Sequence, residues 1–176
     1  TRKTISLDPS GGIPPSLRAV ASSRIRYIIG ALKRIMKNKI VVIGCGRLGA
    51  SIANDVSFRG KDVIVLDKDE NSFARLDENF SGLKLVGNCS TIDELKEAQI
   101  ESADEVVIAT GDDNVNLLVT YLCAKLIHVP HIFVRFDDPD NSYLIQGMPV
   151  RAIYPFMLSK KSYNQYRGLE ETEETK

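Results

Sequence analysis

The segment from Lys39 to Asp67 constrains the fold of this chain most. It starts with an apolar run, continues with Gly44-Cys-Gly-Arg-Leu-Gly49, and ends with a second apolar run that closes on Asp67. Between the two runs, small and apolar residues recur at helical spacing, at Gly49, Ile52, Ala53 and Val56. The order strand, glycine turn, helix and strand ending in a carboxylate is typical of a dinucleotide-binding βαβ unit.

Each glycine of the turn has a separate expected role. Gly44 permits the tight turn after the first strand, Gly46 lets the backbone approach a pyrophosphate, and Gly49 lets the helix pack close to the strand. The N–H groups of the first helical turn then face the phosphates. This glycine spacing alone is a weak signal, but Asp67 stands at about the expected 20-residue offset and strengthens it. The segment therefore predicts a bound adenine nucleotide.

Two charged residues of this unit suggest specific contacts. Asp67 can accept two hydrogen bonds from a ribose diol and would repel a 2′-phosphate, which favours NAD or an adenosine phosphate over NADP; the alternative is a solvated acid at a strand end. Lys68 and Asp69 are more typical of the rim. Arg47 can reach a phosphate of its own ligand or of one bound to an adjacent subunit, or it can simply face solvent at the helix start.

From Lys39 onward, short β-branched runs alternate with helical patterns, as in a parallel sheet covered by helices on both faces. Strands are expected near 39–44, 62–67, 83–86, 104–110, 131–136 and 150–154. Helices are expected near 47–59, 71–79, 91–98, 113–128, 139–147 and 156–167. The pattern predicts an α/β fold with a doubly wound, Rossmann-type parallel sheet of order 3-2-1-4-5-6, whose ligand lies where the order reverses.

The residues after the first five strands should therefore meet at one crevice. They are small, polar or charged: Cys45-Gly-Arg-Leu-Gly49, Asp67-Lys-Asp69, Gly87-Asn-Cys-Ser90, Thr110-Gly-Asp-Asp-Asn114 and Arg135-Phe-Asp-Asp138. Loops are commonly polar in any case. Thr110 and Asp113 fit ligand contact and capping of the following helix equally well.

Composition narrows the function classes. The 23 Lys and Arg balance the 23 Asp and Glu, so the chain as a whole has no nucleic-acid-type charge excess. Cys45, Cys89 and Cys123 share no zinc spacing and suit a reducing compartment. No apolar run approaches the about 20 residues of a membrane-spanning helix.

The two ends differ from the centre in charge. Residues 1–38 form a basic arm in which Asp8 is the only acid, and residues 22–37 fit a basic amphipathic helix. That helix can dock on its own domain or a partner chain, contact a membrane surface or direct the chain to an organelle, or be foreign to the mature protein. Residues 168–176 form an acidic tail.

The histidines give little support for a metal or an enzyme. His128 and His131 are the only two, Pro130 between them breaks helical register, and no Cys or acid stands at ligand spacing. The pair is expected in a loop that enters the fifth strand. A hydride-transfer enzyme would also need a substrate domain and a general acid or base, and nothing after the sixth strand suggests one.

The motifs together resemble one family. Gly44-Cys-Gly-Arg-Leu-Gly49, Asp67, Gly87-Asn-Cys-Ser90, Ala109-Thr-Gly-Asp-Asp-Asn-Val-Asn-Leu117 and Val134-Arg135 are similar to the TrkA-N family, the N-terminal nucleotide-binding lobes of RCK (regulator of K+ conductance) proteins. The resemblance covers about residues 39–160. Its Asp-x-x-Asn-Leu stretch separates this family from ordinary dehydrogenases.

The resemblance implies a non-enzymatic, cytoplasmic regulatory subunit on the inner face of the cell membrane. It would bind NAD(H) or AMP, ADP or ATP, without a metal, and gate a K+ transporter or channel by rearrangement of a homo-oligomer, with the helix at 156–167 as the dimer-crossing element. A complementary RCK subunit is a further expected partner. The resemblance carries over the phosphate turn, Asp67 for the ribose, and the Asn88-Cys89 backbone beside the adenine. With the strand-end residues, the candidate nucleotide-binding residues are Gly44, Cys45, Gly46, Arg47, Leu48, Gly49, Asp67, Lys68, Asn88, Cys89, Thr110, Gly111 and Arg135.

The chain departs from the family pattern in two respects. Asn88 replaces the acid that commonly follows the third strand, and the usual C-terminal ligand-sensing subdomain does not follow the last helix, so the chain resembles an N-terminal lobe alone. Two other functions stay open: the cofactor-binding domain of an NAD-dependent oxidoreductase, and a free-standing nucleotide sensor unrelated to K+ transport.

Overall fold

The computed structural model describes residues 39–168. The expectations for the basic arm at 1–38 and for the acidic tail from residue 169 onward fall outside the described residues.

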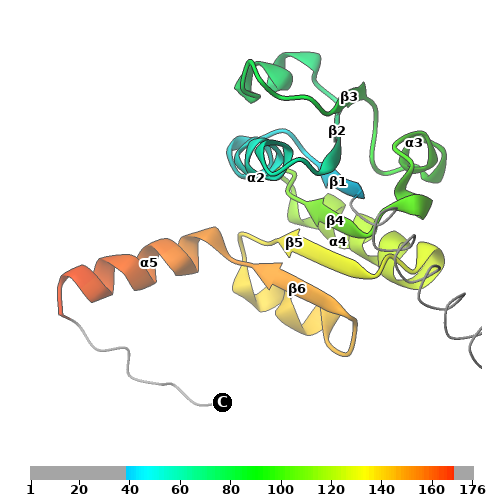
Figure 1. Cartoon of the computed structure of the whole chain (residues 1–176). Coiled ribbons are helices and arrows are strands. Elements are labelled where there is room, and N and C mark those ends of the chain that lie inside the picture. The colour runs from blue at the N-terminus through cyan, green and yellow to red at the C-terminus, as the bar shows by residue number, and fades with distance from the viewer. Residues whose placement is uncertain (1–38, 169–176) are drawn as a thin grey trace, which may run out of the picture. The chain divides into compact units, whose positions relative to one another are not determined.

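The described chain forms one six-stranded sheet in which all neighbouring strands are parallel (Figure 1). Its order is β3-β2-β1-β4-β5-β6, as the sequence predicted. The strands are β1 (Lys39–Ile43), β2 (Asp62–Asp67), β3 (Leu83–Val86), β4 (Glu105–Ile108), β5 (His131–Arg135) and β6 (Val150–Ile153). The fold class is therefore confirmed, and the strand order reverses between β1 and β4.

The helices follow the predicted positions but not always the predicted type. The α-helices are α2 (Arg47–Phe58), α3 (Ile92–Glu97), α4 (Asp113–Tyr121) and α5 (Pro155–Tyr166). Within residues 39–168, η1 (Glu70–Arg75) and η4 (Pro139–Ile145) are 3-10 helices, and so is η2 (Ile100–Ser102), which was not predicted. The single helix expected at 113–128 changes at Leu122 into the π-helix η3 (Leu122–Ile127).

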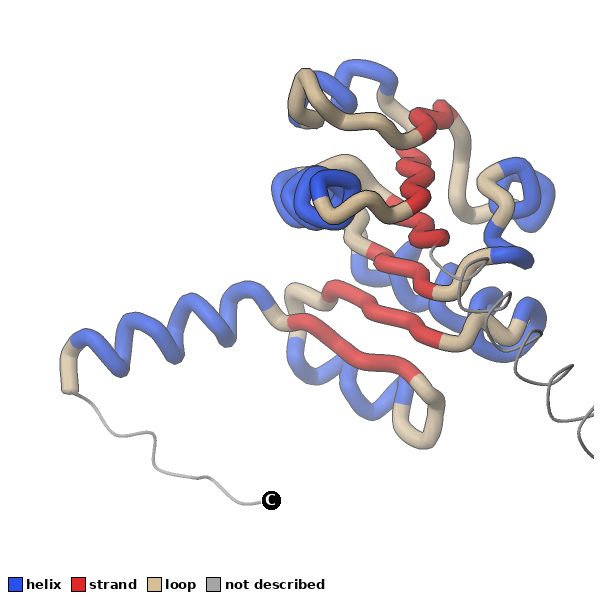
Figure 2. Tube along the Cα trace, viewed as in Figure 1, coloured by secondary structure: helices blue, strands red, loops and turns tan. Residues whose placement is uncertain are grey.

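Two apolar clusters hold helices on the two faces of the sheet (Figure 2). On one face, α2 and η1 pack on β1 and β2 through residues such as Ala53 and Phe73. On the other face, α3, α4 and η4 pack on the central strands through Leu95, Val119 and Ile145. The interiors of β1 and β2 are buried from both sides, which explains their nearly unbroken apolar and β-branched runs.

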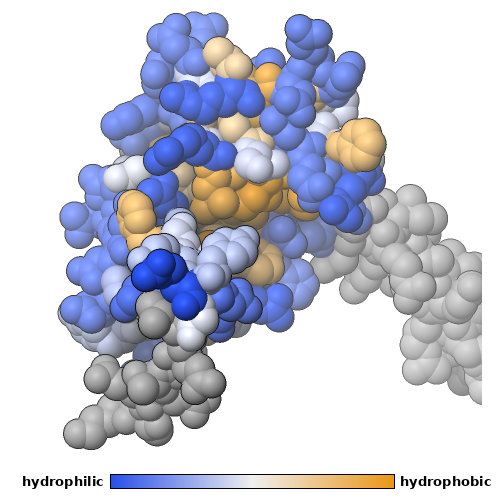
Figure 3. All heavy atoms as spheres, turned by 90° about the vertical axis from the view of Figure 1, so that its left-hand side faces the viewer, coloured by the Kyte–Doolittle hydropathy of each residue, from blue (hydrophilic) through white to orange (hydrophobic). Residues whose placement is uncertain are grey.

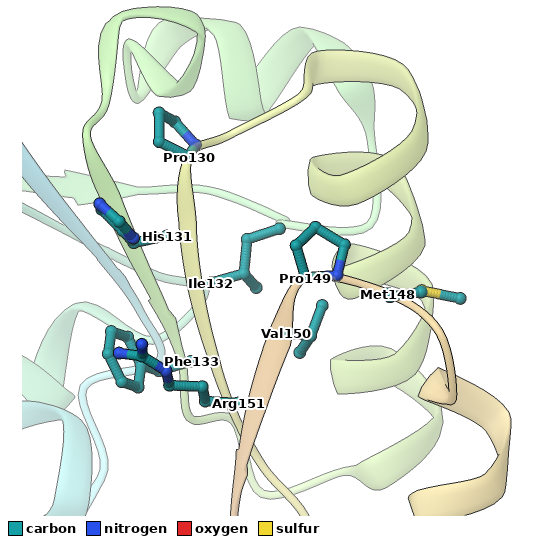
Figure 4. Close-up of a pocket in the computed structure, with 8 residues that line it drawn as sticks. All are labelled: Pro130, His131, Ile132, Phe133, Met148, Pro149, Val150 and Arg151. Carbon is teal, nitrogen blue, oxygen red and sulfur yellow. The ribbon is translucent and has the colours of Figure 1, made fainter.

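The edge formed by β5 and β6 is less covered. The guanidinium of Arg151 lies over the Phe133 ring, 5.6 Å from its centroid, and both border a hollow between Pro130 and Pro149 (Figure 4). His131 and Arg151 are exposed in the described chain. Helix α5 follows β6 and buries none of its residues.

Candidate functional site

A cavity lies at the strand ends where the sheet order reverses. Helix α5 follows β6 on the left of Figure 1, so the carboxyl ends of the parallel strands face that side. Figure 3 looks onto this side and shows apolar residues surrounded by hydrophilic ones. The cavity measures about 670 Å³ and is lined by the last residues of β2 and β5 and by the segments that follow β1 to β4. This is the expected position of a ligand crevice in a doubly wound sheet.

Most of the predicted nucleotide-binding residues line this crevice. They are Gly44, Cys45, Gly46, Arg47, Asp67, Lys68, Asn88, Cys89, Thr110, Gly111 and Arg135. Leu48 and Gly49 do not line it. Leu48 packs against the apolar cluster beneath α2. Gly49 is turned toward the first strand, and a β-carbon on it would lie 1.9 Å from Gly44 O and 3.4 Å from Val42 Cγ1.

Four other lining residues belong to the strand-end segments that were expected at the crevice, although they were not named as nucleotide contacts: Asp69, Gly87, Ser90 and Asp112. The lining residues that the sequence did not place there are Leu66, Ser72, Arg75, Ala109 and Val115. Leu66 and Ala109 lie at strand ends, so the same strand-end reasoning would have found them. Ser72 and Arg75 come from η1, and only the packing of that short helix against the sheet brings them to the crevice.

The geometry of the glycine turn separates the roles of Gly44 and Gly46. Gly44 has φ +94°, and a β-carbon there would lie 2.7 Å from Ala109 O, so the turn itself requires glycine. Gly46 has an ordinary φ of −72°, and a β-carbon there would meet only Ala109 O, at 4.0 Å. Packing therefore does not require glycine at position 46, whereas a ligand that touches the backbone there would. The site fits a pyrophosphate in this respect.

Asp67 is held in place by the backbone around it. Its Oδ2 accepts a hydrogen bond from Cys45 N at 2.6 Å, and its Oδ1 accepts one from Asp69 N at 2.9 Å. A carboxylate has about four acceptor positions. Two are therefore left for a ribose diol, and the carboxylate is already oriented at the crevice wall.

The cations of the crevice are distributed unevenly. Among the described residues, Arg47, Lys68 and Arg75 form no ion pair with an acid, and α2 has no acidic residue in its first turn. The Arg135 guanidinium, by contrast, bonds Asp137 through Nε (2.9 Å) and Nη2 (3.0 Å). Positive charge available to an anion is therefore concentrated near the glycine turn and the end of β2.

The two crevice thiols are not arranged as nucleophiles. Burial raises the pKa of Cys45 above its ordinary value, and the nearby Asp67 carboxylate raises it further. Burial likewise raises the pKa of Cys89. Both thiols are therefore neutral at pH 7, whereas a reactive cysteine requires the thiolate.

The start of α4 corrects one expectation. Its N-cap is Asp112, whose Oδ1 accepts hydrogen bonds from Asn114 N (2.8 Å) and Val115 N (3.2 Å), so neither Thr110 nor Asp113 caps the helix. Thr110 Oγ1 instead donates to Asn116 Oδ1. The Asp113 carboxylate accepts from Asp137 N, 24 residues along the chain.

The histidines lie away from the crevice. His128 ends η3 with φ 60°, and its Nδ1 lies 3.2 Å from Ala124 O. His131 is the first residue of β5. The part of the chain that the structure describes contains no group of three or more His, Cys, Asp or Glu placed to hold a metal. None of its helices is both long enough and apolar enough to cross a membrane.

The comparison with known families agrees with this geometry. The TrkA-N domain model matches residues 40–155, which include the whole sheet except Lys39 and every residue that lines the crevice. The chain belongs to the TrkA-N domain family. The family that the sequence motifs resemble is thereby confirmed.

Named relatives of this TrkA-N chain belong to potassium uptake systems. It is 31% identical over 114 residues to the Trk system potassium uptake protein TrkA of Streptomyces coelicolor, covering 65% of this chain and 51% of the relative. It is 35% identical over 102 residues to the TrkA homolog of Methanothermobacter thermautotrophicus, covering 58% of this chain and 47% of the relative. The chain thus spans about half the length of these relatives.

Solved structures share the fold at low sequence identity. The Kef C-terminal domain of Shewanella denitrificans in its AMP-bound form has a TM-score of 0.63 at 21% identity, covering 77% of this chain and 84% of the other. GsuK bound to ADP has a TM-score of 0.62 at 20% identity, covering 76% of this chain and 35% of the other. The GsuK channel bound to NAD has a TM-score of 0.55 at 16% identity, covering 72% of this chain and 23% of the other.

Proposed function

We propose that this chain is the nucleotide-binding part of a regulator of a membrane K+ transporter or channel, and that NAD(H) or an adenine nucleotide binds in its crevice. The observation that carries the proposal is the open side of Gly46, where the backbone of the glycine turn borders the cavity without a packing reason for glycine. Membership of the TrkA-N family supports it. So do the potassium uptake relatives and the AMP, ADP and NAD complexes of structures with this fold.

The residues of the crevice have distinct roles in this proposal. The phosphates lie at the first turn of α2, near Arg47, where N–H groups and an unpaired cation face an anion. Asp67 accepts hydrogen bonds from the two ribose hydroxyls at its two remaining acceptor positions. The adenine lies beside the backbone of Asn88 and Cys89. A 2′-phosphate would approach the Asp67 carboxylate, which disfavours NADP.

Regulation in this proposal works by differential binding. A ligand shifts a conformational equilibrium only if it binds one arrangement more tightly than another. Helix α5 supplies a surface for such an arrangement, because its apolar side chains are 49% to 90% exposed: Phe156, Met157, Leu158, Tyr163 and Tyr166. A helix of this length is marginal in water without tertiary packing. We expect α5 to be covered in a homo-oligomer at the inner face of the cell membrane.

Two measurements on the full chain test this function. Titration calorimetry with NADH, ADP and AMP should show one saturable site per chain, and light scattering should show at least a dimer whose size or shape changes with ligand. The chain should bind NADPH more weakly than NADH. A protein that stays monomeric at tens of micromolar with and without nucleotide would contradict the regulatory part, and absence of any heat would contradict the binding part.

A further inference from the structure

Asn116 is a fully buried polar side chain of α4 next to the crevice. Its Oδ1 accepts hydrogen bonds from Thr110 N (3.1 Å) and Thr110 Oγ1 (2.5 Å). Its Nδ2 donates to Thr110 O (3.2 Å) and to Arg135 O (2.9 Å). An asparagine amide has two donor hydrogens and two acceptor lone pairs, so this side chain uses its whole hydrogen-bonding capacity.

These bonds lie where the sheet opens. The pairing between β4 and β5 ends at Ile108 and Val134, so the backbone beyond those residues needs hydrogen-bond partners other than this ladder, although Arg135 still pairs with Ile153 of β6. Asn116 supplies them to Thr110 and Arg135, both of which line the crevice. The side chain therefore sets the separation of the two strand ends that form one half of the site.

Asp113 holds the segment that follows Arg135, next to the crevice. Its carboxylate accepts hydrogen bonds from Asp137 N (3.0 Å), Asp138 N (3.1 Å) and Asn141 Nδ2 (2.9 Å). This fixes the backbone of Asp137, whose carboxylate neutralises Arg135. The first two turns of α4 thus hold the end of β5 at two points, through Asn116 and Asp113.

The wall held in this way differs chemically from the opposite one. The ionic groups at the ends of β4 and β5 are already engaged, since Asp112 caps α4 and Arg135 is paired, while Ala109 and Val115 add apolar surface. The cations that form no ion pair within the described part of the chain, Arg47, Lys68 and Arg75, lie on the β1 and β2 side. The β4 and β5 half therefore suits an uncharged ring and ribose better than a terminal phosphate.

We propose that Asn116 is a positioning residue that keeps the β4 and β5 half of the crevice in shape for the second half of a dinucleotide. The inference rests on the proposed function, in which Asp67 binds the adenosine ribose. A dinucleotide then lies across the crevice and reaches the ends of β4 and β5, whereas AMP stays on the β1 and β2 side. Asn116 itself touches no ligand and acts through Thr110 and Arg135.

Titration calorimetry of the full chain with NADH and with AMP tests this role. Wild-type chain should bind NADH more tightly than AMP. Asn116→Ser, which shortens the side chain, should lower the affinity for NADH at least tenfold and change the affinity for AMP less than twofold. Asn114→Ser is the matched control, because Asn114 lies on the same helix, is exposed, and should leave both affinities unchanged.

The outcomes separate this inference from the proposed function. If wild-type chain binds neither ligand, the proposed function fails and the inference with it. If it binds AMP but gains nothing from the second half of NADH, or if a folded Asn116→Ser keeps the wild-type affinity ratio, only the inference is overturned. Should Asn116→Ser fail to fold, Asp113→Asn replaces it, since the partly exposed Asp113 holds the same strand end and the same fall in the ratio is expected.

Discussion

Substitution of Gly46 by valine should remove nucleotide binding without unfolding the chain. Gly46 has φ −72°, which any residue adopts, and a β-carbon there has only Ala109 O nearby, at 4.0 Å. Gly46 is the N-cap of α2, and valine is a poorer N-cap than glycine, so we expect the free energy of unfolding to fall by less than about 1 kcal/mol. The side chain would, however, occupy the space through which a pyrophosphate reaches the turn. We expect the affinity to fall at least about a hundredfold, which is roughly 3 kcal/mol.

Gly44→Ala is the matched comparison in the same turn. At φ +94° an alanine is strained by about 1–3 kcal/mol. Its β-carbon would also lie 2.7 Å from Ala109 O and 2.8 Å from Thr110 N, and such overpacking costs about 1–3 kcal/mol more. The total of about 2–6 kcal/mol should lower the melting temperature of this variant far more than that of Gly46→Val.

Thermal unfolding and titration calorimetry of the two variants check the reasoning. Gly46→Val should melt near the wild-type temperature and give no heat with NADH, ADP or AMP, whereas Gly44→Ala should melt well below it. Wild-type affinity in Gly46→Val would show that the phosphates lie elsewhere. A strongly destabilised Gly46→Val would show that packing, and not a ligand, requires this glycine.

Three further predictions address single features. Asp67→Asn should weaken nucleotide binding by about 1–3 kcal/mol, because charge-assisted hydrogen bonds to the ribose become neutral ones; unchanged affinity in calorimetry would remove Asp67 from the site. Truncation after Pro155 should shift sedimentation toward the monomer, because it removes the exposed apolar side chains of α5; an unchanged oligomer would place the interface elsewhere. Burial raises the pKa of the Cys123 thiol from 9.0 to about 12 in the folded state. Below pH 9 the thiol is neutral in the folded and the unfolded chain, so stability does not depend on it there. As the pH rises from 9 toward 12, only the unfolded chain loses the proton, and up to about 4 kcal/mol of folding stability is lost. Urea unfolding of Cys123→Ala should show a weaker loss over that range, and an equal loss would refute the assignment.

The sequence was most informative where local pattern and tertiary environment agree. β2 and β3 occupy the predicted residues. For β2 the reason is that a β-branched run bounded by polar residues has few other ways to bury itself. β3 is short and mostly exposed, and it pairs with β2 at the edge of the sheet. The glycine turn and Asp67 were predictable for a related reason, since their spacing is set by the backbone path. The predicted strand at 104–110 ends early, at Ile108, because the chain leaves the ladder there to form the crevice.

Features that depend on distant contacts were not predictable. Asp112 and Asp113 are adjacent acids before a helix, and nothing local shows that one caps α4 while the other binds the backbone after β5. In the sequence, Asn116 is recognisable only as part of a family motif. Its four hydrogen bonds to Thr110 and Arg135 form only in the folded chain, where α4 lies beside the ends of β4 and β5. Arg75 reaches the crevice through the packing of η1.

Native mass spectrometry of the purified full chain, with and without added NADH, ADP and AMP, tests the central proposal most directly. The proposal predicts one nucleotide per chain on a dimer or larger assembly, and no added mass on the Gly46→Val variant under the same conditions. A wild-type chain that stays free of nucleotide at millimolar concentrations of all three ligands would contradict it.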